Sequence, residues 1–199
     1  MMMMIRLCAS DMDGTLLNEE HVLSEKTLDV VKSLRERGVL VALCSGRSTP
    51  SIREHAERLK TTVTCGGEKS IVSPPIVAYN GAVVRLGSGE TVFTSRVPEA
   101  AVDAVLSFAE REACMCQYYI DEKIYCVCAT AAHREFARAY QELTRVYDAH
   151  IFTDSYAEAR ALGLPYKLLM MTPSAEIDAR MERLRAALPE NSAHVIRGT

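Results

Sequence analysis

The sequence predicts an α/β fold, a doubly wound (Rossmann-like) parallel sheet followed by a second, α+β domain. Short apolar runs alternate with helical patterns through the first 80 residues, in the order strand, helix, strand, helix, strand. This order is typical of a doubly wound sheet. Each of the three apolar runs ends at polar residues, and the pattern changes to hairpins and helices from about residue 86 onward.

The first predicted strand covers residues 5–9 and ends at Ser10 and Asp11. After a loop, Ser24 has the position of a helix N-cap, and Gly38 is placed to end that helix. We therefore expect one buried strand and one amphipathic helix before residue 39.

The second strand is predicted at residues 39–44, "VLVALC", where six apolar residues follow one another without alternation. Such a run is typical of a strand covered on both faces of a parallel sheet. In the "SGRSTP" that follows, Ser48 or Thr49 is expected to cap a helix with Pro50 at its first position.

The third strand is predicted at residues 76–79, ending at Asn80 and Gly81. Residues 61–73 between the second helix and this strand are interpreted as an irregular insertion. Ligands of doubly wound sheets bind at the carboxyl ends of the strands. Asp11, Ser45 and Asn80 occupy the three predicted strand ends.

The second half predicts several further elements from hydrophobic periodicity and turn residues. Pairs of strands are expected around "LGSGE" and "DEK", and a strand at "YKLLMM". The remaining expected elements are helices at 98–112, 131–147, 154–163 and 174–188, and a last strand beginning in "SAHVIR".

Composition excludes several classes of protein. The formal charge of −3 and the 48% hydrophobic fraction describe a soluble globular protein with a sizeable core. No basic tract indicates nucleic acid, and no apolar run reaches the roughly 20 residues that span a bilayer. Seven cysteines, an odd number, favour a reducing compartment over a disulfide framework. We expect a cytoplasmic protein without membrane or nucleic-acid partners.

The segment "DMDGTLL" carries two carboxylates two residues apart, Asp11 and Asp13, directly before Gly14 and Thr15. Unpaired carboxylates are costly to bury, so a positive group is expected beside them, most simply a metal ion. A solvated acidic turn is the alternative, because Asp and Gly are common turn residues.

Three segments at the predicted strand ends resemble motifs of a known family. "DMDGTLL" after an apolar strand resembles the first motif of the haloacid dehalogenase superfamily, and "LCSGR" resembles its second motif. "VAYNGAVV" is similar to the third-strand segment of the Cof-type phosphatases, which carry an α/β cap after that strand. The resemblance implies a core domain at residues 1–85 and a cap domain at residues 86–199.

The resemblance also implies a Mg²⁺-dependent phosphohydrolase acting on small phosphorylated metabolites such as sugar phosphates. Asp11 would be the nucleophile and a Mg²⁺ ligand, forming an aspartyl-phosphate. Asp13 would bind Mg²⁺ through its backbone carbonyl and act as general acid and base. The residues expected to contact phosphate or substrate are Gly14, Ser45, Gly46, Arg47, Asn80 and Gly81.

The family pattern also includes a late Lys and a G-D-x-x-N-D motif that completes the Mg²⁺ site. The sequence has no Gly-Asp dipeptide, and its only late lysine, Lys167, falls in a predicted cap strand. We therefore expect a shortened form of a longer enzyme, lacking the C-terminal part of the core. Its first strand would then be an exposed apolar edge.

Two alternatives remain. A phosphomannomutase-like phosphotransferase is less well supported, because "CSGRSTP" does not match the G-G-S-D pattern of that group. A non-catalytic module that binds phosphate ligands or a protein partner is compatible with the missing late motifs.

Cys114, Cys116, Cys126 and Cys128 raise a zinc hypothesis. With a three-residue loop at 121–123, Cys116 would lie opposite Cys128 and all four would share one sheet face. Structural zinc instead favours C-x₂₋₄-C spacings, so a buried apolar face is the preferred interpretation. The five histidines show no metal-binding spacing and are expected at the surface.

Overall fold

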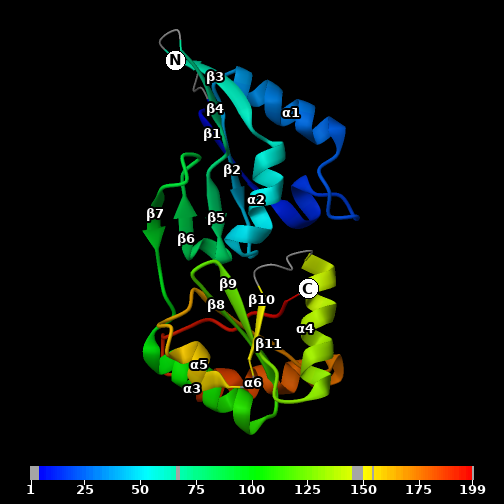
Figure 1. The fold of residues 1–199 in the computed structure, drawn as a ribbon, viewed down its shortest axis with the longest axis vertical. Helices are drawn as coiled ribbons and strands as arrows, with labels where there is room; N and C mark the ends of the chain where they lie inside the picture. Colours follow the sequence, from blue (N-terminus) through cyan, green and yellow to red (C-terminus); the bar gives the residue numbers. More distant parts are fainter. Residues whose placement is uncertain (1–4, 66–67, 145–149, 154, 199) are drawn as a thin grey trace. The chain divides into compact units, whose positions relative to one another are not determined.

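The computed structural model describes residues 5–65, 68–144, 150–153 and 155–198. The chain divides into two compact units, the N-terminal unit (Met1–Ser95) and the C-terminal unit (Arg96–Thr199) (Figure 1). This division falls later than the boundary placed after residue 85, because the hairpin that follows is hydrogen-bonded to the N-terminal sheet.

The N-terminal unit contains a five-stranded sheet in the order β1-β2-β5-β6-β7. β1, β2 and β5 are parallel, which confirms the Rossmann-like parallel sheet, and β6 and β7 continue the sheet as an antiparallel hairpin. The strand bounds are β1 (Leu7–Asp11), β2 (Leu40–Cys44), β5 (Ile76–Ala78), β6 (Val83–Arg85) and β7 (Thr91–Thr94).

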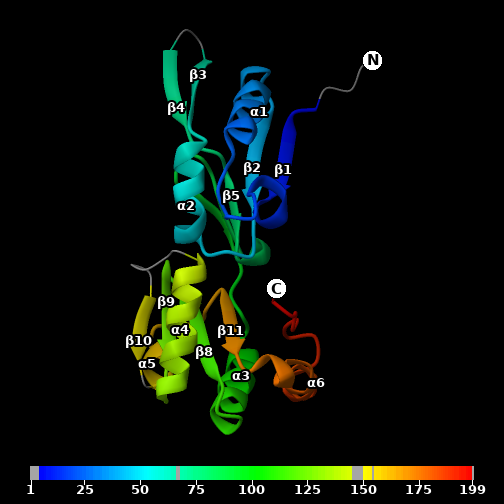
Figure 2. The ribbon, with the colours of Figure 1, turned by 90° about the vertical axis from the view of Figure 1, so that its right-hand side faces the viewer.

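Two helices, α1 (Glu25–Glu36) and α2 (Thr49–Arg58), connect the parallel strands. The strands succeed one another in one direction, so two right-handed crossovers place both helices on one face (Figure 2). Ser24 caps α1, accepting from the Thr27 amide at 3.1 Å, as predicted. Pro50 is the second residue of α2, after the N-cap Ser48, rather than its first.

β1 forms one edge of the N-terminal sheet. Leu7 pairs with Leu40 across the β1–β2 ladder. Leu7 of the edge strand is 55% exposed, and its neighbour Leu40 of β2 is 43% exposed, so this end of the β1–β2 ladder is apolar and open to solvent. Such an edge leaves backbone donors and acceptors available for pairing.

Residues 61–73 are not an irregular insertion. They contain an antiparallel pair, β3 (Thr61–Cys65) and β4 (Glu68–Val72), in which Cys65 pairs with Glu68. The local pattern contained this information: two β-branched runs flank Gly-Gly, a spacing typical of a two-residue hairpin. The two glycines lie outside the described residues.

The C-terminal unit has a four-stranded sheet in the order β10-β9-β8-β11. Its strands are β8 (Met115–Ile120), β9 (Lys123–Val127), β10 (His150–Thr153) and β11 (Lys167–Met171). Its helices are α3 (Glu99–Arg111), α4 (Ala131–Thr144), α5 (Tyr156–Arg160) and α6 (Ile177–Ala187), with a short turn η3 (Ser174–Glu176) before α6.

Two predictions for this unit were wrong. β10 was missed because the four residues "HIFT" are too short for periodicity to separate them from a helix end. The expected strand in "SAHVIR" does not form: residues 193–198 have no regular secondary structure. The last residues predicted for the helix at 131–147 lie outside the described residues.

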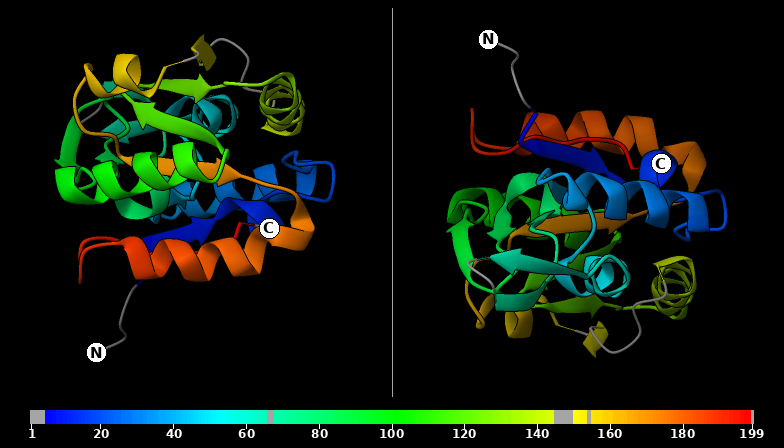
Figure 3. Two further views of the ribbon diagram at one scale, coloured as in Figure 1. Left: turned by 90° about the horizontal axis from the view of Figure 1, so that it is seen from below. Right: turned by 90° about the horizontal axis from the view of Figure 1, so that it is seen from above.

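α3 and α4 cover opposite faces of the C-terminal sheet (Figure 2). On the α3 side, Val102, Leu106 and Ala109 pack in one buried cluster with the β8 residues Cys116, Tyr118 and Ile120. α6 runs alongside α3 (Figure 3), joined by a second cluster of Val105, Phe108 and Leu184. Every residue of β8 is buried as a result.

The cysteines do not share one sheet face. The β8–β9 turn has two residues, both with positive φ, so Cys116 pairs with Val127 and Gln117 pairs with Cys126. This one-residue shift puts Cys116 and Cys126 on opposite faces. Burial raises the pKa of both thiols to about 12, so both are protonated near neutral pH and behave as small apolar side chains. The buried apolar interpretation therefore holds, without the shared face.

Candidate active site at the strand ends

The carboxyl ends of three parallel strands lie side by side in the N-terminal unit. Asp11, the last residue of β1, is in register with Cys44 of β2, which is in register with Val77 of β5. Asp11 and the segments that directly follow β1, β2 and β5 together contain every candidate site residue of the sequence analysis. The expected convergence of the strand ends is therefore present.

The chain turns sharply after β1, in η1 (Met12–Leu16). Met12 is buried and anchors the turn, while Asp11 and Asp13 on either side of it are exposed. Gly14 has a φ of 70°, a left-handed conformation that glycine adopts at little cost. The two carboxylates are therefore presented by a turn whose buried spacer residue keeps it against the core.

Asp13 is held by a bidentate ion pair with Arg47. The Arg47 Nε donates to Asp13 Oδ2 at 2.8 Å, and its Nη2 donates to Oδ1 at 2.6 Å. The Arg47 side chain is 13% exposed and that of Asp13 is 42% exposed. The hydrogen bonds from Arg47 lower the pKa of the Asp13 carboxyl below its ordinary value of 3.8. Arg47 is thus a largely buried partner of Asp13, which the sequence alone could not distinguish from a surface arginine.

His21 joins this pair, a contact that the sequence analysis missed. Its Nδ1 lies 3.2 Å from Asp13 Oδ1 and 3.3 Å from Arg47 Nη2. Ser51, in the first turn of α2, accepts a further hydrogen bond from Arg47 Nη1 at 3.4 Å. No spacing rule links His21 to Asp13 or Arg47, so periodicity could not have found it.

The ends of β2 and β5 are joined by backbone hydrogen bonds around Ser45. The Ser45 amide donates to the Val77 carbonyl at 2.9 Å, and its carbonyl accepts from the Asn80 amide at 3.2 Å. The Ser45 hydroxyl accepts from the Arg47 amide at 3.2 Å. Ser45 is buried, so its position is set by these contacts.

The turn after β5 carries unusual backbone conformations. Tyr79, Asn80 and Gly81 have φ values of 52°, 57° and 97°, all left-handed. Such conformations are unfavourable for a buried tyrosine and concentrate at functional sites. A Cβ on Gly46 would lie 2.6 Å from the Asn80 side-chain oxygen. Glycine at position 46 therefore leaves the space that the Asn80 side chain occupies.

The Asp11 carboxylate makes no hydrogen bond or ion pair within the described part of the chain. The pKa of the adjacent Cys44 thiol is raised, first by burial and second by the negative charge of Asp11. No group of three or more His, Cys, Asp or Glu side chains that could hold a metal occurs among the described residues. Mg²⁺ nevertheless commonly binds through one or two carboxylates, with water and phosphate oxygens completing its octahedron. Asp11 and the Asp13 carbonyl fit such a partial site.

Lys167 lies in β11, as predicted, with its ammonium 5.4 Å from the centre of the Tyr119 ring. Burial lowers its pKa. It belongs to the C-terminal unit.

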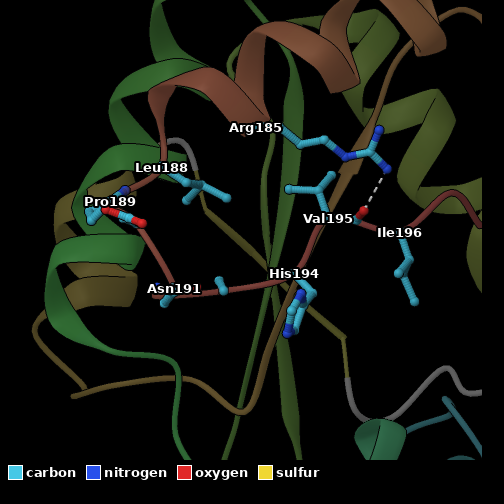
Figure 4. Close-up of a pocket in the computed structure, with 9 residues that line it drawn as sticks. Arg185, Leu188, Pro189, Asn191, His194, Val195 and Ile196 are labelled. Atoms are coloured by element: carbon cyan, nitrogen blue, oxygen red, sulfur yellow. Dashed lines mark hydrogen bonds between the residues drawn. The ribbon is translucent and has the colours of Figure 1, made fainter.

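A cavity of about 470 Å³ lies between the end of α6 and the segment that follows it (Figure 4). Arg185 donates to the Val195 carbonyl at 2.9 Å across it, and His194 borders it. Glu190 is the only carboxylate in its lining. The cavity therefore lacks the paired carboxylates that distinguish the strand ends of the N-terminal unit.

The fold and the site define an α/β protein whose first parallel strand ends in paired aspartates. A model of the haloacid dehalogenase-like hydrolase family matches residues 8–197. The chain belongs to this family. In the described part of the chain, no helix combines the length and the apolar character needed to cross a membrane.

Curated relatives are similar to part of the chain. It is 38% identical over 68 residues to a 5-amino-6-(5-phospho-D-ribitylamino)uracil phosphatase of Bacillus subtilis, covering 33% of this chain and 27% of the relative. It is 31% identical over 97 residues to a putative phosphatase of Haemophilus influenzae, covering 49% and 32% respectively. The matched part of the chain thus spans about a quarter to a third of the length of these relatives.

A solved structure shares the fold. The crystal structure of a haloacid dehalogenase-like hydrolase from Bacteroides thetaiotaomicron matches with a TM-score of 0.78 and 20% identity. The match covers 98% of this chain and 68% of that one. The likeness therefore extends through both units.

Proposed function

We propose that the chain carries the nucleophile of a Mg²⁺-dependent phosphoric monoester hydrolase that acts on small phosphorylated metabolites such as sugar phosphates. The observation that carries the proposal is the convergence of Asp11, Ser45 and Asn80 at the ends of neighbouring strands, with Arg47 bound to Asp13. The relative named for a phosphorylated ribityl compound supports this substrate class.

Asp11 is the proposed nucleophile because its carboxylate is exposed and adjoins the convergent strand ends. A carboxylate oxygen attacks phosphorus, and the bond between phosphorus and the leaving alcohol oxygen breaks. Asp13 gives a proton to that oxygen. Water then attacks the aspartyl-phosphate, Asp13 takes its proton, and inorganic phosphate leaves with Asp11 regenerated.

The lowered pKa of Asp13 suits its role as base, since a carboxylate is what receives the proton. The proton-donating step requires a higher pKa and therefore a weaker hold by Arg47. A phosphoryl group can weaken that hold, because guanidinium binds phosphate and carboxylate in the same bidentate way. Arg47 is accordingly proposed to contact the phosphate.

The Asp11 carboxylate and the Asp13 carbonyl would hold Mg²⁺. When bound, the ion offsets the negative charge of the nucleophile and of the phosphoryl oxygens. Ser45 and the turn amides at Gly14 and Gly46 are proposed to donate to phosphate oxygens.

Asn80 and Gly81 are proposed to lie nearer the rest of the substrate. We also propose that the N-terminal unit is a core domain and the C-terminal unit a substrate-selecting cap, with the boundary at Ser95 and Arg96 instead of after residue 85. The placement of Asn80 near the substrate is supported by its exposed side chain and by the close approach of that side chain to Gly46.

The test is Asp11→Asn, assayed by phosphate release from p-nitrophenyl phosphate with Mg²⁺. Removing a nucleophile should lower kcat by at least about a thousandfold. The melting temperature should stay unchanged, because the exposed Asp11 carboxylate makes no described contact to lose. Glu19→Gln, a nearby exposed acid, is the matched control. Wild-type turnover in Asp11→Asn would refute the nucleophile assignment.

A phosphate-binding role without turnover is the second candidate. It is favoured by the small number of metal-binding side chains at the strand ends among the described residues. Calorimetric binding of inorganic phosphate, together with no Mg²⁺-dependent turnover by the folded wild-type chain, would favour it over hydrolysis.

A further inference from the structure

The loop that carries His21 is closed by several backbone contacts. Leu17 and Leu23 form an antiparallel bridge at its base. Between them, the Asn18 amide donates to the Val22 carbonyl at 3.0 Å, and the Asn18 side-chain oxygen accepts from the Val22 amide at 2.9 Å. The His21 amide donates to the Asn18 carbonyl at 2.9 Å. These contacts set the direction in which residue 21 projects.

His21 itself has a φ of 57°, in the left-handed region. This conformation is unfavourable for residues other than Gly, Asn and Asp. A loop shaped by stability alone would favour one of those three residues at this position. Residues held in such conformations cluster at functional sites. The presence of His at this position therefore suggests a functional role for its imidazole.

The imidazole Nδ1 lies between two partners with opposite requirements. Asp13 Oδ1, at 3.2 Å, can only accept a hydrogen bond, so Nδ1 must carry a hydrogen to bind it. Arg47 Nη2, at 3.3 Å, can only donate, so Nδ1 must be unprotonated to bind it. His21 therefore binds one of the two residues at a time, and a change of tautomer exchanges them without altering net charge.

We propose that His21 is a positioning residue that keeps Asp13 in place after Arg47 has turned to the phosphoryl group of the substrate. The proposal rests on the proposed function. In the free protein, Arg47 donates to Asp13, and the Nδ1 lone pair is assigned to Arg47 Nη2, 3.3 Å away. A phosphate monoester, which carries more negative charge than Asp13, competes for the guanidinium.

Once Arg47 has moved, Asp13 loses both hydrogen bonds that hold its carboxylate. His21 then binds Oδ1 through Nδ1–H. The imidazole is 43% exposed, so water can exchange its proton between the two nitrogens. Asp13 keeps its orientation toward the leaving oxygen while its strongest partner is engaged elsewhere.

Two variants separate the side chain from the backbone. His21→Gly retains the left-handed conformation and removes the imidazole. His21→Asn also tolerates this conformation and places an N–H donor near the position of Nδ1. With p-nitrophenyl phosphate, His21→Gly should lower kcat by about tenfold or more with KM nearly unchanged, the loss of one charge-assisted hydrogen bond. His21→Asn should recover most of kcat.

The melting temperatures of both variants should match that of the wild type. Wild-type kcat in His21→Gly, or no recovery in His21→Asn, overturns the proposal. A wild-type chain that releases no phosphate counts against the proposed function instead, and a second measurement then decides the role of His21.

That measurement is ¹⁵N NMR of histidine-labelled protein, with the His21 signals identified by their loss in His21→Asn. In the wild type, Nδ1 should be the unprotonated nitrogen, because it accepts from Arg47. In Arg47→Leu, Nδ1 should become protonated and bind Asp13, whether or not the chain turns over substrate. The same tautomer in both proteins overturns the proposal.

Discussion

The central strand of the C-terminal unit and the edge strand of the N-terminal unit use polar groups in opposite ways. All six residues of β8 are buried, including Gln117, whereas β1 alternates and leaves Asp11 exposed. Inside the C-terminal sheet, the Tyr119 hydroxyl donates to Gln117 Oε1 at 2.6 Å, and Gln117 Nε2 donates to Cys126 Sγ at 3.6 Å. The side chains of Gln117 and Tyr119 are therefore bound within the C-terminal sheet.

The difference shows where each unit can do chemistry. Gln117 and Tyr119 are committed to hydrogen bonds inside the sheet, which leaves them little capacity to bind a ligand. At the strand ends of the N-terminal unit, Asp11, Asp13 and Asn80 are exposed and keep acceptor capacity for an incoming group. We expect substitutions in β8 and its covering helix to alter stability, and substitutions at the strand ends to alter function.

The largest effect on stability should come from Phe108→Ala. Phe108 is fully buried between α3 and α6, and truncating such a side chain costs about 3–5 kcal/mol through lost burial and an unfilled cavity. Urea unfolding followed by tyrosine fluorescence reports mainly on the C-terminal unit, since Tyr79 is the only tyrosine before residue 96. Ser107→Ala, at an exposed position of the same helix, is the control. Equal midpoints for the two variants would contradict the comparison.

A smaller effect is expected from Gln117→Leu. The substitution removes the hydrogen bond between the Tyr119 hydroxyl and Gln117 inside the buried sheet, at a cost of about 1–3 kcal/mol. Adding Tyr119→Phe also removes the hydroxyl and should recover part of the loss. The free energies of unfolding of both single variants and the double variant form a cycle. Strictly additive losses would show that the two side chains are not coupled.

The smallest effect should come from Asp13→Asn, at the exposed site. The folded-state pKa of Asp13 is lowered, mainly by the hydrogen bonds from Arg47, so the charged form favours folding. The stability that this pair contributes should be present above the ordinary value of 3.8 and disappear as the pH falls through the lower folded-state value. Urea midpoints of the wild type and the variant should thus converge on acidification. A difference that grew toward low pH would contradict the assigned ion pair.

Local patterns predicted most of the elements. Ser24 and Gly38 bound the first helix as expected, and the apolar runs ending at Asp11, Ser45 and Asn80 are parallel neighbours. The failures share a cause. The β3–β4 hairpin, the four-residue β10 and the β8–β9 register depend on which strand pairs with which, and short runs carry too little periodicity to decide this.

By itself, the sequence determined the alternation of strands and helices and the polar residues at the strand ends, because hydrophobic period and turn chemistry act over a few residues. Only the tertiary structure decided that Arg47, 34 positions from Asp13, binds it, and that His21 lies between them. It also decided that Cys116 and Cys126 occupy opposite faces. These outcomes depend on contacts between distant segments, which form only when the whole sheet does.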